Sequence, residues 1–352
     1  MQIIENTLQT ERLTLRPFTL EDAEHMYNNW AQDPDIIRFY THKTCETVEE
    51  VREWIINWAK YFTALEEKNW DYGSYAIVQK FDGEVIGTID YAETDRDIRA
   101  AEVGYMLGKP WRGKGYVTEA LKAVLAHCFD TVGLNRVWAN FNAKNTASGK
   151  VLERAGMTYE GLRRQCTLLN GEIQDREQYA MLKADYEIQK EIAYYTSLPC
   201  NFTEFISVPT LSDGEIYLVC TQKYTNEEKK HVPSYLFAIC KEGEKIGNIG
   251  LRIGYGGGEF GQNLYYGGQI GYDIEEAFRG NGYAVRACRL LVPVAKAHDM
   301  HILLITNDVN NHASRRVCEK LNAKLIRTVT LPEWTDLYKM GQRQSNIFEW
   351  KI

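Results

Sequence analysis

The feature that most constrains the fold of this chain is an internal repeat. Three short blocks of the 352 residues recur in the same order, at offsets of 160 to 167 residues. Because one folding unit present twice produces such a pattern, we expect two copies of one domain, over 1–192 and 200–352. Between them, Pro199 interrupts a helical pattern. The repeated blocks are 82–89 with 242–249, 103–120 with 270–287, and 145–156 with 311–322.

Each copy is predicted to be a mixed α/β domain, because strand-like and helical periodicities alternate along it. The two copies differ near their beginnings. The first copy has two amphipathic segments, 20–30 and 48–62, between its first two strands. The second copy has only 13 residues there, so we expect it to lack this helical pair. It gains a glycine-rich loop at 254–268 instead.

A glycine-containing loop in each copy is the first chemical motif. The sequence Arg-Gly-Lys-Gly-Tyr-Val at 112–117 has its counterpart, Arg-Gly-Asn-Gly-Tyr-Ala, at 279–284. Each follows a predicted strand and opens a predicted helix. Glycine allows the backbone to approach a ligand closely, and a helix start offers unpaired N–H groups to an anion. A tight turn is the alternative for one such loop, but two in the same context favour a pyrophosphate site.

This loop resembles the acetyl-CoA signature of the GNAT acyltransferase superfamily, Arg-x-x-Gly-x-Gly/Ala. The second copy matches it at Arg279, Gly282 and Ala284, whereas the first has Val117 at the last position. The first copy also resembles the Rim-type ribosomal-protein-alanine acetyltransferases over nearly all of 8–187. The second resembles a small uncharacterised GNAT type. The resemblance implies two GNAT domains, each a mixed, mostly antiparallel sheet flanked by helices.

The resemblance also implies the reaction and its cofactor. The amine of an acceptor attacks the thioester carbonyl of acetyl-CoA directly, and the acceptor is a protein N-terminus or a small-molecule amine. Cofactor contacts are implied for Met106, Leu107, Arg112, Gly113, Lys114, Gly115, Tyr116, Val117 and Asn145 in the first copy, and for Ile274, Arg279, Gly280, Asn281, Gly282, Tyr283, Ala284, Asn311 and Ser314 in the second.

Direct transfer needs a base, an oxyanion donor and a proton for the departing sulfur, because an ammonium near its usual pKa of about 10 is not nucleophilic. The resemblance implies Glu102 or Glu160 as the base, or both acting through a shared water, and Ser148 as the residue at the sulfur. The backbone N–H of Met106 or Leu107 is the candidate oxyanion donor. Asn145 and Ser148 have a second interpretation, because either could cap the helix that follows.

The second copy lacks both candidate bases, since Gln269 aligns with Glu102 and Ile326 with Glu160. We therefore expect the N-terminal domain to be the catalyst. The alternatives are catalysis by the C-terminal domain through another base, or a chain that only senses acyl-CoA without turnover.

Charge and composition limit the classes of partner that we expect this chain to bind. The net charge of −7 lies in the first copy, where residues 1–190 carry 23 Lys and Arg against 30 Asp and Glu. We expect no nucleic-acid partner, and the acidic half suits a cationic acceptor. No apolar run of about 18 residues is present, so no membrane span is expected. Eight dispersed cysteines without C-x-x-C suggest a cytoplasmic protein. As to its oligomeric state, we expect a monomer or a homodimer. His298 and His301 are too isolated a pair to predict a metal site.

Overall fold

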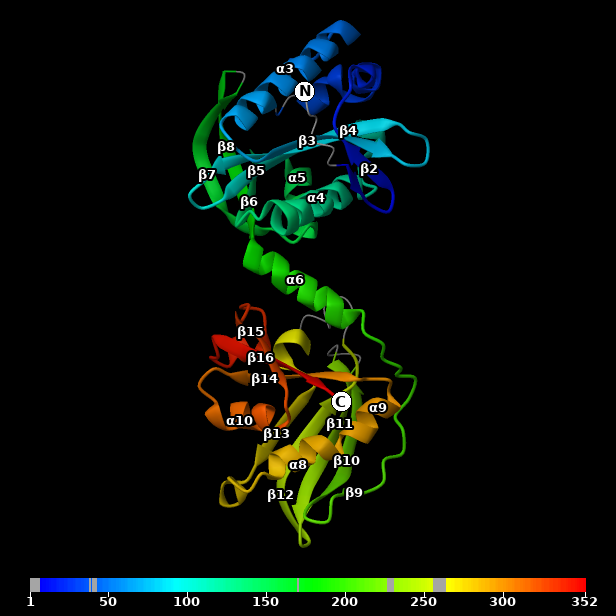
Figure 1. Cartoon of the computed structure of the whole chain (residues 1–352), viewed down its shortest axis with the longest axis vertical. Helices are drawn as coiled ribbons and strands as arrows, with labels where there is room; N and C mark the ends of the chain where they lie inside the picture. The colour runs from blue at the N-terminus through cyan, green and yellow to red at the C-terminus, as the bar shows by residue number, and fades with distance from the viewer. Residues whose placement is uncertain (1–6, 38, 40–42, 170, 227–230, 256–263) are drawn as a thin grey trace. The chain divides into compact units, whose positions relative to one another are not determined.

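The computed structural model describes residues 7–37, 39, 43–169, 171–226, 231–255 and 264–352. The chain divides into two compact units, Met1–Gln189 and Lys190–Ile352. The boundary falls inside helix α6 (Lys183–Thr196), which is labelled in Figure 1. The first turns of α6 belong to unit 1, where Tyr186 stacks on Phe129. Its last turns belong to unit 2, where the Tyr195 hydroxyl donates to Glu349.

Unit 1 is built on one eight-stranded sheet of order β1-β2-β3-β4-β5-β6-β8-β7. Every neighbouring pair is antiparallel except β5 and β6, which run parallel. The mostly antiparallel mixed sheet expected from the sequence is therefore confirmed. Its strands are β1 (Leu8–Gln9), β2 (Leu13–Arg16), β3 (Tyr72–Gln79), β4 (Val85–Asp95), β5 (Ala100–Leu107), β6 (Arg136–Asn142), β7 (Thr158–Leu169) and β8 (Glu172–Leu182).

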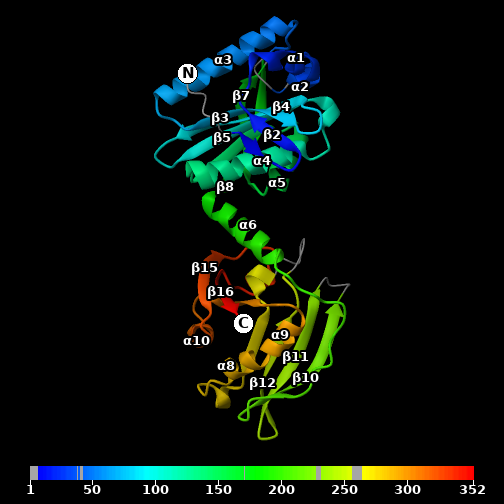
Figure 2. The same cartoon turned by 45° about the vertical axis from the view of Figure 1, so that its right-hand side comes forward.

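Helices cover both faces of this sheet, as Figures 1 and 2 show. Helix α3 packs on one face through Val51 and Ile55, and helix α4 packs on the other through Leu121 and Val124. Thr47 begins α3 by accepting a hydrogen bond from the Glu50 N–H. The helical segments are η1 (Leu20–Asp22), α1 (Ala23–Met26), η2 (Tyr27–Ala31), α2 (Pro34–Ile37), α3 (Val48–Glu67), η3 (Lys109–Trp111), α4 (Tyr116–Ala126), η4 (His127–Val132) and α5 (Thr146–Arg154).

Unit 2 has two sheets instead of one. The first has the order β13-β12-β11-β10-β9, and the second has the order β14-β16-β15. Its strands are β9 (Leu211–Ser212), β10 (Tyr217–Asn226), β11 (His231–Lys241), β12 (Glu244–Arg252), β13 (Ile270–Ile274), β14 (Ile302–Asp308), β15 (Lys324–Thr330) and β16 (Gln344–Lys351). Its helical segments include η5 (Glu276–Phe278), α8 (Tyr283–Leu290), α9 (Val292–Ala297), α10 (His312–Lys320) and α11 (Asp336–Lys339).

The beginning of unit 2 is shorter than that of unit 1. Four residues separate β10 from β11, which leaves no room for the α1–α3 region that stands between β2 and β3 in unit 1. The predicted glycine-rich loop at 254–268 lies partly outside the described residues, because 256–263 are not described. No helix among the described residues combines the length and the apolar character that a membrane crossing requires.

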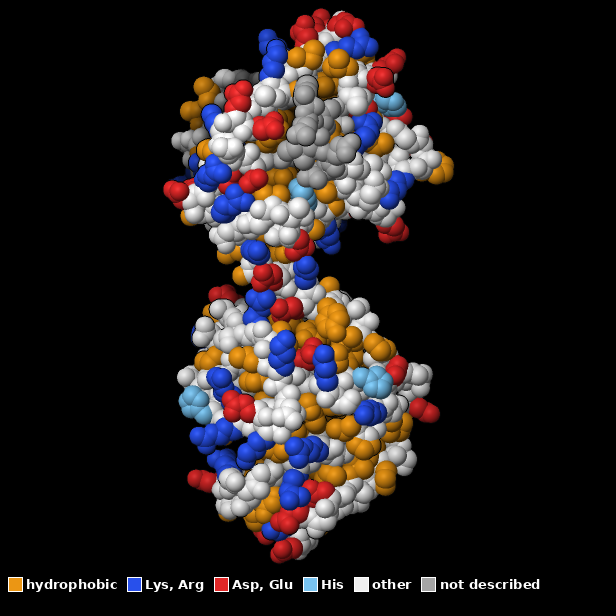
Figure 3. All heavy atoms as spheres, in the orientation of Figure 1, with side chains coloured by type: hydrophobic (Ala, Val, Ile, Leu, Met, Phe, Trp, Pro, Cys, Tyr) orange, Lys and Arg blue, Asp and Glu red, His pale blue; other side chains and the backbone are white. Residues whose placement is uncertain are grey.

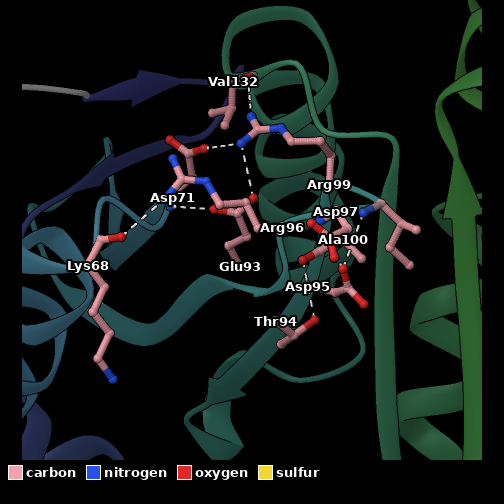
Figure 4. A network of polar contacts seen from close by, with 11 residues as sticks. Lys68, Asp71, Glu93, Thr94, Asp95, Arg96, Asp97, Arg99, Ala100 and Val132 are labelled. Atoms are coloured by element: carbon pink, nitrogen blue, oxygen red, sulfur yellow. Dashed lines mark hydrogen bonds and ion pairs between the residues drawn. The ribbon is translucent and has the colours of Figure 1, made fainter.

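A charge network ties the β4–β5 hairpin of unit 1 to the segment between α3 and β3 (Figure 4). Arg99 donates to the carboxylates of Asp71 at 2.7 Å and Glu93 at 3.0 Å, and to the Val132 carbonyl at 2.8 Å. The Glu93 side chain is fully buried. Since a buried carboxylate is costly without a partner, Arg99 is expected to stabilise unit 1.

We predict that Arg99→Met lowers the free energy of unfolding by about 2–3 kcal/mol, because it leaves Glu93 buried without its cation. The measurement is urea denaturation followed by tryptophan fluorescence, since six of the eight tryptophans lie in unit 1. Arg96→Met is the matched control, because the exposed Arg96 side chain donates, among the described residues, only to the Lys68 carbonyl at 3.3 Å. Equal midpoints for the two variants would contradict the prediction.

Candidate active site

The site of unit 1 begins where β5 and β6 part. The two strands pair in parallel only between Ala100–Glu102 and Arg136–Trp138. Both continue beyond that point, to Leu107 and Asn142, without pairing to each other. Two cavities open at this divergence. They share lining residues, which are Phe39, Tyr105, Met106, Asn145 and Ser148.

The first cavity has a volume of about 440 Å³ and lies at the N-termini of α4 and α5. Its loop has left-handed backbone at Gly113, with φ of 75°, and at Gly115, with φ of 82°. The first residues of α4, Tyr116 to Thr118, line the cavity, and the first N–H groups of any helix have no partner within that helix. Arg112 fixes the loop by donating from Nε to the Leu107 carbonyl at 3.3 Å.

Most of the predicted cofactor residues line this cavity. Lys114 does not, because it sits at the outer side of the loop, where its carbonyl accepts from Arg12 at 3.0 Å. Val117 is 7% exposed and packs into the hydrophobic core, so its extra bulk points toward the sheet. The predicted residues that line the cavity are Met106, Leu107, Arg112, Gly113, Gly115, Tyr116, Val117, Asn145 and Ser148.

The cavity carries more positive charge than the sequence motif implied. Lys144, Lys150 and Arg154 line it together with Arg112, while Asp35 is the one acidic lining residue described. A cationic cavity at a helix N-terminus suits a polyphosphate. The sequence signal for these residues was their position beside the Asn145 and Ser148 motif, which our sequence reasoning did not use.

The two interpretations of Asn145 are separated by comparing the units. Asn145 precedes α5, yet its side chain makes no capping hydrogen bond. Its counterpart Asn311 does cap α10, because its side-chain oxygen accepts from the Ser314 N–H at 3.0 Å. The Asn145 side chain therefore faces the shared part of the cavities without a capping role.

Unit 2 repeats the loop in the same backbone conformation. Gly280 and Gly282 have φ of 85° and 80°, and Arg279 donates from Nε to the Ile274 carbonyl at 2.9 Å. A cavity of about 520 Å³ lies against it. The predicted residues that line it are Ile274, Arg279, Gly280, Gly282, Tyr283, Ala284, Asn311 and Ser314.

One predicted residue is absent from the lining of this cavity in unit 2, and two cationic residues that were not predicted are part of it. Asn281 does not line it, because its side chain folds back to donate to the Phe278 and Arg279 carbonyls. Arg316 and Lys320 add positive charge to the cavity. Figure 3 shows Lys and Arg side chains gathered on this face, over α8 and α10.

The second cavity of unit 1 has a volume of about 360 Å³ and contains two carboxylates. Trp58, Tyr61 and Phe62 of α3 line one side, and Asp90 of β4 and Glu102 of β5 lie on the sheet. The Glu102 carboxylate accepts from Asn140 at 2.5 Å. Among the described residues, the Asp90 carboxylate makes no hydrogen bond or ion pair.

The environment of this pair favours the protonated forms. Burial raises the pKa of Asp90 to about 7, and the nearby charge of Glu102 adds to the increase. Burial also raises the pKa of Glu102, although the positive charges of Arg176 and Arg163 oppose it. A carboxylate with a pKa near 7 is matched to accepting a proton at neutral pH.

The structure does not bring Glu160 to either cavity. It lies at a register shift between β7 and β8, where both its carboxylate oxygens accept from Arg136 and one also accepts from Gln178. These hydrogen bonds lower its pKa. A carboxylate paired in this way is a poor proton acceptor, so we do not retain Glu160 as a base.

Unit 2 lacks the carboxylate pair. Its β12–β13 register places Gly250 opposite Gly271, as Asp90 lies opposite Gly104 in unit 1. Gln269 stands where unit 1 has Glu102, and it is fully buried. Its N–H donates to the Leu304 carbonyl, and its side-chain oxygen accepts from the Leu304 N–H at 2.6 Å. Gln269 therefore joins β13 to β14 structurally.

Sequence reasoning missed Asp90 and Tyr105. Asp90 resembled an ordinary polar residue in an alternating strand, and its absence from the repeat, where Gly250 aligns, was the available signal. Tyr105 lines both cavities and donates to the Ser148 carbonyl at 3.1 Å. Its recurrence as Tyr272, which hydrogen-bonds the Ser314 hydroxyl at 2.9 Å, marked it in the sequence.

Fold and site together define a transferase class: a phosphate-binding loop and a carboxylate-bearing pocket meet between two diverging strands. Within the described residues, no cluster of three or more His, Cys, Asp and Glu is arranged to hold a metal. The chain matches the acetyltransferase (GNAT) domain family over residues 12–158 and 172–324. It belongs to the GNAT family, carries this domain twice, and is an acetyl-CoA-dependent N-acetyltransferase.

Similar proteins carry the same activity in their names. The uncharacterised N-acetyltransferase p20 of Bacillus licheniformis is 32% identical over 180 residues, covering 51% of this chain and 98% of p20. The ribosomal protein uS5-alanine N-acetyltransferase of Escherichia coli is 26% identical, over 51% of this chain and 92% of that enzyme. A crystal structure of a Bacillus anthracis GNAT acetyltransferase is 23% identical with a TM-score of 0.44, covering 51% of this chain and 99% of that one.

We predict that Asp90→Asn stabilises unit 1 at neutral and alkaline pH. The native pKa of about 7 lies above the usual 3.8, so the ionised carboxylate disfavours folding increasingly as pH rises from about 4 to 7. Asparagine removes this penalty. The gain in unfolding free energy should be about 2 kcal/mol larger at pH 8 than at pH 5. Urea titrations at both pH values measure it, and an equal gain at both would refute the assignment.

Proposed function

We propose that unit 1 transfers the acetyl group, with acetyl-CoA in the cationic cavity and a primary amine in the carboxylate-bearing cavity. The observation that carries this proposal is the meeting of the two cavities at Tyr105, Met106, Asn145 and Ser148. A thioester placed there has the glycine loop on one side and Asp90 and Glu102 on the other. The amine and the acyl carbon are thereby held in one orientation, which lowers the entropic cost of their reaction.

The backbone supports Leu107, rather than Met106, as the oxyanion donor. The Gly108 N–H donates to the Ile86 carbonyl, so the backbone groups of Gly108 point toward β4. Because these groups alternate in direction along a strand, those of Leu107 point the other way, into the divergence. Arg112 reaches the Leu107 carbonyl on that side. The Leu107 N–H is thus free to stabilise the developing oxyanion.

Asp90 is the better-placed first acceptor of the ammonium proton. It lies opposite Gly104 on β5, about 7 Å along the strand from Met106, whereas Glu102 is two residues further away. A Cβ at position 104 would lie 3.5 Å from Asp90 Oδ1, so the carboxylate spreads over this glycine. In our proposal Asp90 takes the proton, and Glu102 raises its basicity by like charge.

The remaining steps use groups at the junction of the cavities. After the ammonium gives its first proton to Asp90, the neutral nitrogen attacks the carbonyl carbon. As the C–S bond breaks, the second proton of the attacking nitrogen goes to the sulfur, so the products are the amide and the thiol of coenzyme A. Ser148 lines both cavities, and Tyr105 is hydrogen-bonded to its backbone. We assign Ser148 to hydrogen-bond the departing sulfur, with Tyr105 as its positioning residue.

Unit 2 is proposed to bind acetyl-CoA without turnover. Its loop, its arginine contact and its cationic cavity repeat those of unit 1. Glycine and glutamine stand at the two carboxylate positions, and neither accepts a proton from an ammonium. The buried role of Gln269 between β13 and β14 supports a structural replacement of the base.

The acceptor class is proposed from the pocket. A cavity of about 360 Å³ with two carboxylates and an aromatic wall suits one compact cationic head group. That head group is a small-molecule amine or a protein N-terminus. The similar Escherichia coli enzyme is named for an alanine of ribosomal protein uS5. Eight free cysteines and acetyl-CoA dependence support a cytoplasmic setting.

We predict that Asp90→Asn lowers kcat/KM about 100-fold or more at pH 7, because general base catalysis typically contributes that much. Glu102→Gln should lower it less. It should also move the acidic limb of the kcat/KM profile to lower pH, because removing the Glu102 charge lowers the pKa of Asp90 from about 7. Rates are measured between pH 5 and 9 with saturating acetyl-CoA and a panel of primary amines.

Glu160→Gln is the matched control for this series. It removes a carboxylate of the same type from outside the cavities, and kcat/KM should stay within about twofold of the unaltered chain. An unchanged pH profile in Glu102→Gln, or a large loss in Glu160→Gln, would show that the base is misassigned.

We predict two acetyl-CoA sites, one per glycine loop. Gly115→Asp and Gly282→Asp should each remove one site from the calorimetric stoichiometry, since a carboxylate there repels the pyrophosphate. Gly115→Asn and Gly282→Asn are the controls, because asparagine also tolerates the left-handed backbone but carries no charge. Turnover should be lost only with Gly115→Asp. Loss of turnover with Gly282→Asp instead would place catalysis in unit 2.

A further inference from the structure

Unit 1 has a third cavity, of about 610 Å³, that the proposed reaction does not use. It forms because β2 pairs with only the second half of β3, from Ala76 to Gln79. Pro17 follows the last paired residue of β2, Arg16. The first half of β3, Tyr72–Tyr75, therefore has no strand on that side, and α3 forms the opposite wall.

Three side chains with polar atoms line this cavity and make no hydrogen bond in the described part of the chain. They are Tyr75, Tyr91 and His127, which are 3%, 2% and 7% exposed. Their polar atoms are not among the fully buried, unpaired ones, so they stay accessible from the cavity, where a ligand can pair with them. Burial lowers the pKa of His127, so its ring is neutral at pH 7 and both donates and accepts.

Gly73 is required for this arrangement. A Cβ at this position would come 2.5 Å from the Tyr91 ring and 2.7 Å from the Tyr75 hydroxyl. The absence of a side chain lets both phenols reach the cavity beside β3. His127 enters from the other side, as the first residue of η4, a π-helical turn of the kind often found at functional sites.

The walls of the cavity are aromatic and its charge is negative. Phe18, Trp58, Phe62 and Trp70 line it, and Glu66 is an acidic lining residue. Among the described lining residues there is no Lys or Arg. Aromatic rings and a carboxylate together attract organic cations and disfavour anions.

The charge network of Figure 4 holds the rim of the cavity in place. Asp71 and Val132 line the cavity, and Arg99 bonds the carboxylate of the first and the carbonyl of the second. The negative charge of Asp71 is offset by this ion pair with Arg99. Glu66 is left as the carboxylate that a cation meets, since its one described hydrogen bond is a 3.4 Å contact from Tyr72.

We propose that this cavity is a second small-molecule site, which binds an aromatic cation. The ring of the ligand lies between the aromatic walls, its cationic group lies toward Glu66, and its polar atoms pair with Tyr75, Tyr91 and His127. Apolar walls with a few converging polar groups are the usual form of a ligand pocket.

The site has a direct connection to acceptor binding, a consequence that rests on the proposed function. Trp58 and Phe62 of α3 line both this cavity and the carboxylate-bearing one. A ligand packed on these rings from one side changes the wall that the acceptor meets on the other. Occupancy therefore alters the KM for the amine, while the cofactor loop is untouched.

The test uses three ligands of similar shape in calorimetric titrations of the intact chain. They are the phenethyltrimethylammonium cation, 2-phenylethanol and the 3-phenylpropanoate anion. The quaternary nitrogen cannot be acetylated, so binding is measured independently of turnover, and its failure is distinguishable from failure of the proposed reaction. We expect the cation to bind at least tenfold more tightly than the anion. Glu66→Gln should bring its affinity close to that of the alcohol.

Substitutions that fill the cavity with a large side chain test where the cation binds, and the same substitution outside the cavity is their control. Thr63 and Ala59 are exposed α3 residues that line it, so Thr63→Trp or Ala59→Trp should weaken cation binding at least tenfold. Asn57→Trp, on the same helix but outside the lining, should leave binding unchanged. Acetyl-CoA affinity and Tm verify that each variant is folded.

Two outcomes would overturn the proposal. One is the absence of saturable cation binding to the unaltered chain at millimolar concentration. The other is unchanged binding in both filled variants together with its loss in the Asp90→Asn/Glu102→Gln double variant, which would place the ligand in the acceptor pocket.

Discussion

The divergence of β5 and β6 is the constraint on which the site of unit 1 depends. Parallel pairing between these strands ends at Glu102 and Trp138, so their remaining backbone groups face an opening instead of each other. Unpaired backbone groups in a protein interior need partners. Here they face two cavities, and the N-terminal residues of α4 and α5, the helices that follow the strands, line the first of these cavities. The position of the site is therefore determined by the divergence of two strands of the sheet, and the side chains determine what the site can bind.

Both units have the glycine loop and the cavity beside it, whereas Asp90 and Glu102 of unit 1 have no carboxylate counterparts in unit 2. Two carboxylates close together in a partly buried pocket are unfavourable, since each raises the energy of the other's charge. Unit 1 retains that cost at Asp90 and Glu102. Unit 2 has Gly250 and a buried Gln269, whose amide instead satisfies the Leu304 backbone. The glutamine that stands in place of Glu102 thus contributes hydrogen bonds where the two sheets of unit 2 meet.

Helix α3, which has no counterpart between β10 and β11 of unit 2, forms a wall of two cavities in unit 1. Its aromatic face separates the carboxylate-bearing cavity from the larger cavity beside β3, so two pockets share Trp58 and Phe62. Insertion of the α1–α3 region also leaves half of β3 without a strand on its β2 side, because β2 ends at Arg16, before Pro17. In unit 2, where β10 leads almost directly into β11, that geometry does not arise.

The sequence alone determined the double domain, the mixed and mostly antiparallel sheet, and the glycine loops, because repeats, periodicity and glycine positions are local patterns that need no partner to be read. Local motifs also identified Glu102 and Ser148 as candidate site residues, and both line the cavities of unit 1. Only the tertiary structure showed that Asp90 and Glu102 line the same cavity as diagonal neighbours, since their proximity depends on the β4–β5 register. It also showed that the Glu160 carboxylate is hydrogen-bonded to Arg136 at a register shift between β7 and β8. The division of unit 2 into two sheets likewise became visible only in the structure. Charge and basicity depend on neighbours in space, and no local pattern records them.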